Sequence, residues 1–248
     1  MTQALYLEDA YLKEFQATVE SIKDGKYAVL NQTAFYAQGG GQPFDTGKWV
    51  RLSDHKEFSV VFVGKFNRVI SHEINGDGLK AGDTIKGIID WERRYKLMRS
   101  HTAAHILSEV FHREAGALIT GNQLDLGQSR IDFSLDNFDK EKISEYVQKA
   151  NEVVQQDMAV KSYFVSKEEA AKIPRLSKLA IGLPKDIENI RIVAIGDFDR
   201  QGDGGTHVKS TKEIGTIELV KAENKGKNNR RVYFKLKENG DKPAIRFD

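Results

Sequence analysis

The sequence predicts an α+β protein: a small N-terminal β-barrel domain over residues 1–90, then an α/β domain over residues 91–248 with a metal-binding helix. Three observations support this fold class. Short apolar runs separated by Gly, Asp and Asn turns fill the first 90 residues, which is typical of a small antiparallel barrel. A long helical pattern follows Asp90 and contains His101 and His105. After it, strand and helix patterns alternate.

Composition indicates an ordinary globular protein. The 248 residues include 40% hydrophobic and 30% charged residues, enough for one large domain or two moderate ones. Because the chain has no cysteine, disulfides and thiolate metal sites are excluded. A formal net charge of +2 restricts any polyanion site to a local patch. No signal peptide or membrane-spanning run is evident, so we expect a cytoplasmic protein.

Seven short runs in the first domain read as strands. Asp24-Gly25 marks a tight hairpin, and the loop from Gln38 to Pro43, with three consecutive glycines, is incompatible with a regular element. The expected strands cover residues 4–7, 13–22, 26–30, 47–53, 58–66, 68–74 and 84–90.

The central helix is expected to start at Asp90, whose carboxylate can cap the first turn, and to end at Gly116. Its spacing places Leu97 and His101 toward the interior, whereas Arg93 and Arg99 are expected in solvent.

The second half alternates strands and helices. We expect one or two strands in 118–135 with a Gly-Asn turn at 121–122, then an amphipathic helix over 138–158. A strand over 160–166 precedes a short helix over 167–173, which Pro174 stops. An apolar strand over 190–198 leads into a Gly-rich loop over 199–208, and strands over 211–223 and 230–238 close the chain.

His101 and His105 lie four residues apart, so a helix stacks their imidazoles on one face, one turn apart. Such a pair can bind a zinc ion, although packed or surface histidines are the commoner reading. His207 and Asp203 lie in the later Gly-rich loop and complete a donor set that zinc accepts. No glutamate directly follows His101, which disfavours a zinc peptidase.

Three motifs resemble a known family. HTAAH at 101–105, GGTHV at 204–208 with TKEIG after it, and the early TAFYAQGGGQP at 33–43 are similar to the editing domain of alanyl-tRNA synthetase. They are also similar to its free-standing relatives, the AlaX alanyl-tRNA editing proteins of medium length. Their order matches, and the resemblance covers nearly the whole chain.

The resemblance implies an aminoacyl-tRNA deacylase that acts in trans. Its substrate would be mischarged tRNA(Ala), chiefly Ser-tRNA(Ala) with Gly-tRNA(Ala) as a second candidate, hydrolysed with Zn²⁺ in the editing cleft. Residue by residue, the ligands would be His101, His105 and His207, with Asp203 at the fourth position, where many relatives have cysteine. Asp203 therefore either binds zinc or, unligated, orients a water as a base.

Selectivity for a serine hydroxyl requires polar groups that alanine would leave unpaired. Thr120 is the expected hydroxyl reader, and Gln123 and Asn122 are further candidates for the pocket wall, to which the resemblance points. Ordinary turn residues are the alternative reading.

Two features are expected to contact tRNA. Arg93, Arg94 and Arg99 precede His101 by one to two turns and could meet acceptor-stem phosphates, although solvation of a helix face would also explain them. The glycines of the early loop could form a lid or a tRNA-facing loop, or only a structural turn: Gly39, Gly40 and Gly41. An RNA-binding module with a structural zinc is the alternative function, and a monomer and a homodimer both stay open.

Overall fold

The computed structural model describes residues 2–137, 139–173, 176 and 189–237. The chain forms two compact units. The first comprises Met1–His101, Leu124–Leu126 and Asp203–His207, and the second comprises the remaining segments. The division falls inside the central helix, between His101 and Thr102. The domain boundary expected near residue 90 stays a prediction.

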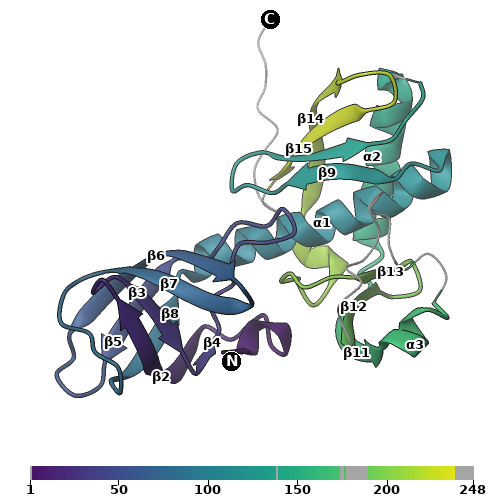
Figure 1. The fold of residues 1–248 in the computed structure, drawn as a ribbon. Coiled ribbons are helices and arrows are strands. Elements are labelled where there is room, and N and C mark those ends of the chain that lie inside the picture. The colour runs from purple at the N-terminus through teal and green to yellow at the C-terminus, as the bar shows by residue number, and fades with distance from the viewer. Residues whose placement is uncertain (1, 138, 174–175, 177–188, 238–248) are drawn as a thin grey trace, which may run out of the picture. The chain divides into compact units, whose positions relative to one another are not determined.

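A closed six-stranded barrel dominates the first unit, as the sequence predicts (Figure 1). Its strand order is β2-β3-β7-β6-β5-β8, and all of its pairs are antiparallel. The strands are β2 (Glu14–Lys23), β3 (Tyr27–Leu30), β5 (Gly47–Arg51), β6 (Glu57–Phe66), β7 (Val69–Asn75) and β8 (Thr84–Ile89). Alternate residues point inward and enclose an apolar core around Trp49, Phe35 and Phe58.

The chain start differs from the prediction. Residues 4–7 were expected to form a strand, but only β1 (Gln3–Ala4) is extended, and a 3₁₀ turn, η1 (Leu5–Leu7), follows it. β1 pairs in parallel with β4 (Gln32–Thr33) in a separate two-stranded sheet. The apolar alternation in this run instead buries Tyr6 against Tyr36, which one turn of helix also achieves.

The central helix α1 (Trp91–Ala115) has the expected ends. Asp90 Oδ1 accepts a hydrogen bond from Arg93 N at 3.2 Å, and Gly116 ends the helix with φ +64°. Arg99, expected in solvent, is buried at 8% exposure, so this expectation is wrong.

The second unit contains the sheet β14-β15-β10-β9. Its strands are β9 (Ile119–Gln123), β10 (Ser129–Phe133), β14 (Thr216–Asn224) and β15 (Arg230–Lys237). The turn expected at Gly121-Asn122 is wrong, because β9 runs through both residues and the chain reverses after Gln123. The ring of Phe111 on α1 stacks on Phe133 of β10 at 4.2 Å. α2 (Lys140–Gln155) is joined to β14 by two hydrogen bonds between Asn151 and the Ile217 backbone.

A second sheet of this unit has the order β11-β12-β13. It consists of β11 (Val160–Ser166), β12 (Asn189–Ile195) and β13 (Asp199–Gly202), and α3 (Lys167–Ala170) follows β11. Two expectations are wrong here. The Gly-rich loop starts only after β13, and residues 211–214 form the 3₁₀ turn η2 (Thr211–Ile214) before β14. Pro174, expected to stop the short helix, lies outside the described residues. No helix in the described part of the chain is long and apolar enough to cross a membrane.

Candidate metal centre

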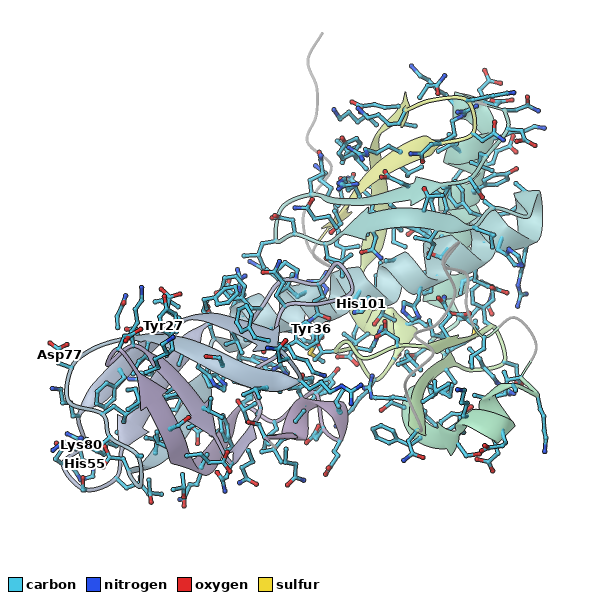
Figure 2. All side chains as sticks on the ribbon, viewed as in Figure 1. Tyr27, Tyr36, His55, Asp77, Lys80 and His101 are labelled. Carbon is cyan, nitrogen blue, oxygen red and sulfur yellow. The ribbon has the colours of Figure 1, made fainter. Side chains whose placement is uncertain are left out.

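Four side chains predicted as metal ligands come together in the structure. His101, His105, Asp203 and His207 each offer one nitrogen or oxygen, and these four atoms lie within 4.8 Å of one another. The three histidines are buried, and the Asp203 side chain is 19% exposed. Figure 2 labels His101 on α1. Asp203 is thus the most exposed member of a largely buried cluster.

The helix and the Gly-rich loop each supply part of this cluster. α1 places His105 one turn after His101, and the ring of His207 stacks on that of His101 with centroids 4.3 Å apart. The loop approaches the helix closely at Gly205, where a Cβ would overlap the His101 ring. Gly205 N also donates to Asp203 Oδ1 at 2.6 Å, which fixes one oxygen of that carboxylate.

Gln42 fixes the orientation and tautomer of His101. Its side chain is fully buried, and Oε1 accepts from the backbone N–H of Thr206 at 3.1 Å. Its Nε2 donates to Thr206 Oγ1 at 2.8 Å. Because the N–H of Thr206 requires an acceptor, Oε1 must face it, and His101 Nδ1, 2.9 Å from the same oxygen, must carry a proton. The lone pair of His101 is therefore on Nε2, the atom that faces Asp203.

Asp199 lies beside His105 without a hydrogen bond to its Nδ1. Its Oδ2 lies 3.5 Å from His105 Nδ1 and accepts from Gln201 Nε2 at 2.9 Å. A carboxylate at this position favours a proton on Nδ1, which places the lone pair of His105 on Nε2. The early Gly-rich loop thus sets the tautomer of His101, and β13 places a carboxylate beside Nδ1 of His105.

The Asp203 carboxylate contacts two of the three histidines. Asp203 Oδ1 lies 3.0 Å from His207 Nε2, and Asp203 Oδ2 lies 3.5 Å from His101 Nε2. Three imidazoles with one carboxylate form a donor set able to bind a metal ion.

The residues expected to form the serine pocket lie on β9 in the second unit. Thr120 and Gln123 are exposed, and Asn122 is half-buried. The Thr120 hydroxyl donates to Asn229 Oδ1 at 3.1 Å. Their role in selectivity stays a prediction.

The three arginines expected to contact tRNA have different surroundings. Arg94 is fully buried and forms an ion pair with Asp45, and it also donates to Ala10 O and Ala34 O. This burial argues against the phosphate contact predicted for Arg94, because the guanidinium already has carboxylate and carbonyl partners. Arg99 is buried too, whereas Arg93 is half-buried and lies over the Phe44 ring at 5.3 Å.

The early Gly-rich loop forms a tight turn at the surface. Gly39 and Gln42 form an isolated antiparallel bridge, and Gly40 and Gly41 between them have positive φ of 57° and 86°. Gly39 and Gly40 are exposed, while Gln42 points inward to the cluster. The loop therefore combines a surface turn with an internal contact to His101.

Sequence reasoning missed Gln42 and Asp199. Gln42 was quoted only as part of a motif, and Asp199 was placed in a loop. Spacing could not reveal either role, because each contacts a histidine that is 59 or 94 positions away in the chain.

Comparison with known proteins points to translation. Residues 190–233 match the threonyl and alanyl tRNA synthetase second additional domain, and residues 3–93 match the class II (A) tRNA synthetases. The alanyl-tRNA editing protein AlaX-M of Methanosarcina barkeri is 54% identical over 95% of this chain and 99% of its own length. The chain belongs to the AlaX-M family of alanyl-tRNA editing proteins.

More distant relatives extend this family. The AlaX-M protein of Saccharolobus solfataricus is 45% identical over 96% of the chain and its own full length. The alanine–tRNA ligase of Pyrobaculum aerophilum is 41% identical over 90% of the chain, which corresponds to 25% of the ligase. The resemblance stated from three motifs is thus confirmed along nearly the whole chain.

Proposed function

We propose that this protein is a trans-editing hydrolase that removes the wrong amino acid from mischarged tRNA(Ala), chiefly serine and secondarily glycine. The observation that carries the proposal is the four-residue cluster of His101, His105, Asp203 and His207 in a chain of this editing family. The bond to be cleaved is an ester between the aminoacyl group and a ribose hydroxyl of the tRNA 3′ end. We place the activity in the cytoplasm, where aminoacyl-tRNA is used.

We propose Zn²⁺ as the ion of this site. A cysteine-free set of three imidazoles and one carboxylate suits zinc, and the Nε2 lone pair that Gln42 fixes on His101 suits it further. When bound, zinc supplies either a water of lowered pKa or polarisation of the ester carbonyl. Sets of oxygens alone would favour magnesium or calcium instead.

The protein groups hold protons and orient the reactants. Gln42 keeps the proton of His101 on Nδ1, and the Asp199 carboxylate beside His105 Nδ1 favours the same tautomer for that ring. We assign Asp203 as the fourth ligand, since its two oxygens lie 3.0 and 3.5 Å from Nε2 of His207 and His101. Thr120 is retained as the reader of the serine hydroxyl, with Gln123 beside it on β9.

The decisive experiment is a deacylation assay across Ser-, Gly- and Ala-tRNA(Ala), with purified protein that has been loaded with zinc. We expect rapid release of serine, slower release of glycine, and retention of alanine. Binding of tRNA without hydrolysis of any of the three would instead support an RNA-binding module with a structural ion.

A further inference from the structure

An unusual hairpin tip joins β6 to β7 in the barrel. Phe66, at the end of β6, is 59% exposed, the highest value among the large hydrophobic side chains that the structure describes. Its cross-strand partner Val69 is 42% exposed. Two cations, Lys65 and Arg68, flank this apolar pair, and both are exposed. Apolar side chains surrounded by positive charge at a surface mark an interaction site.

The aromatic side chains form a continuous strip from this tip. The rings of Phe62 and Phe66 cover Gly64, where a Cβ would lie 2.7 Å from one ring and 2.8 Å from the other. Phe44 packs edge-on against Phe62 with centroids 4.8 Å apart, and Arg93 lies over Phe44. We call these side chains, with Lys65 and Arg68, the Phe66 strip: Phe44, Phe62, Lys65, Phe66, Arg68 and Arg93.

The strip is connected to the early Gly-rich loop. Phe44 follows Pro43 and Gln42 directly, and Gln38 N donates to Val63 O on β6 at 3.0 Å. His55 precedes β6 and Asp77 follows β7, so both mark the end of the barrel opposite the hairpin tip. Figure 2 shows that this end is remote from His101. The same loop that orients His101 through Gln42 therefore also borders the strip.

The turn at the tip keeps an arginine where glycine is favoured. Asn67 and Arg68 both have positive φ, 48° and 68°. The β2–β3 connection of the same barrel also has two consecutive positive φ angles, 55° at Asp24 and 65° at Gly25. Asp-Gly is a residue pair that such turns prefer. A long side chain in this region is strained, and strain of this kind accumulates at functional sites.

Lys65 and Arg68 are available for a ligand. Across the described ranges, the structure shows no ion pair or hydrogen bond from either side chain. Three other cations of the barrel surface, Lys26, Lys48 and Lys86, are each paired with a glutamate. Unpaired cations beside an exposed ring match an RNA strand, in which a phosphate accompanies every base.

We propose that the Phe66 strip receives unpaired nucleotides of an RNA strand: a base stacks on Phe66, while Lys65 and Arg68 contact adjacent phosphates. This inference rests on the proposed function, in which tRNA is the substrate, and adds a stacking surface to it. Stacking tolerates any base, so the strip supplies affinity and direction for the strand rather than sequence recognition.

The first test compares Phe66→Ala with Tyr27→Ala, an exposed aromatic of the same barrel away from His101 (Figure 2). We expect Phe66→Ala to raise KM for mischarged tRNA about tenfold with kcat unchanged, and Tyr27→Ala to leave both unchanged. A KM of Phe66→Ala equal to that of the wild type, in an active enzyme, overturns the inference and leaves the proposed function intact.

The second test needs no hydrolysis. In Phe66→Trp, we expect uncharged tRNA and a short single-stranded RNA ending in CCA to quench the added tryptophan emission, beyond the change seen with the wild type. This readout stays valid even if no mischarged tRNA is hydrolysed, so the two proposals fail separately. An absence of quenching overturns the inference. A Phe66→Ala variant that differs from the wild type only in its oligomeric state, measured by sedimentation, also overturns it, because the strip would then be a contact between copies of this chain.

Arg68→Gly separates binding from folding. We expect this variant to melt at the same or a higher temperature, because glycine relieves the positive φ, yet to bind tRNA more weakly with a salt-dependence slope lower by about one. Lys80→Gln, which removes an exposed cation at the remote end of the barrel, should not change the slope (Figure 2). Equal slopes in Arg68→Gly and the wild type would contradict the phosphate contact.

Discussion

Single side chains decide what the cluster can bind, and Asp203 is the most informative of them. Its carboxylate oxygens lie 3.0 Å from His207 Nε2 and 3.5 Å from His101 Nε2. We expect Asp203→Cys to keep one zinc per chain and Asp203→Ala to lose it, as measured by elemental analysis after dialysis. Full zinc content in Asp203→Ala together with lost turnover would assign Asp203 the role of a base instead.

Gln42 contacts the cluster through His101, so any effect of Gln42 on metal binding is expected to pass through that ring. Removing its Oε1 leaves the His101 ring free to change tautomer or rotate, and loss of such a partner lowers metal affinity about 10- to 100-fold. We expect this loss in Gln42→Ala, measured by competition with a chelator. Gln38→Ala, at an exposed position of the same loop, is the matched control and should bind zinc as the wild type does.

His72 illustrates a histidine that folding keeps neutral. Burial between Trp49 and Phe35 lowers its pKa to about 4, although a hydrogen bond from Nδ1 to Ala28 O acts in the opposite direction. Nε2 accepts from Thr33 Oγ1, so the neutral ring satisfies both nitrogens.

The stability contribution of neutral His72 is therefore present above pH 6.5 and is lost as the pH falls from 6.5 to about 4, because the unfolded chain binds the proton first. The full loss corresponds to about 3 kcal/mol of unfolding free energy. Urea titrations at several pH values should show this dependence reduced in His72→Gln but retained in His55→Asn, which changes an exposed histidine with φ +58°.

At the scale of elements, the close approach of the 203–207 loop to α1 determines the site. Gly205 permits this approach, since a Cβ there would overlap the His101 ring and lie 2.9 Å from Gln42 Oε1. We expect Gly205→Ala to weaken zinc binding by more than about tenfold, measured by chelator competition. Its neighbour is an ideal control: a Cβ at Gly204 meets no atom within 4 Å, so an equal loss in Gly204→Ala would contradict the steric explanation.

α1 links the site to the barrel core in a different way. Arg94 on its first turns is buried with Asp45, and Asp45 Oδ2 also accepts from Tyr36 N. The helix start is thus held by ionic and carbonyl contacts rather than by apolar packing alone. This arrangement explains why Arg94, two turns before His101, stabilises the fold and is not exposed at the surface.

At the scale of the whole molecule, the four candidate ligands are separate from the barrel core. The barrel core consists of apolar side chains from its strands, whereas the cluster uses only α1 and the 203–207 loop. We therefore expect chelation to reduce Ser-tRNA(Ala) deacylation more than about a hundredfold while the far-UV circular dichroism spectrum stays nearly the same, with recovery on adding zinc. Unfolding on chelation would support a structural ion, and unchanged activity would exclude a catalytic one.

Periodicity and turn residues predicted most elements correctly. The barrel strands, the Asp90 cap, the Gly116 end and helix α2 follow local rules that act within a few residues. The error at residues 4–7 arose because a short apolar run fits a helical turn or a strand equally well. The error at residues 121–122 arose because a Gly-Asn pair, typical of turns, lies here within a strand. Tertiary contacts decided those cases, for example when β10 and β9 paired through Gly121 and Asn122.

By itself, the sequence determined the barrel, the helix that carries His101 and His105, and the four candidate ligands. Hydrophobic periodicity, capping residues and motifs are all features of the local sequence. Only the tertiary structure decided which side chains hold those ligands in place. Gln42 and Asp199 meet His101 and His105 across long stretches of chain, and Arg94 was drawn inward by Asp45. Such pairings depend on close approach and desolvation, and these physical conditions arise only once the elements have packed.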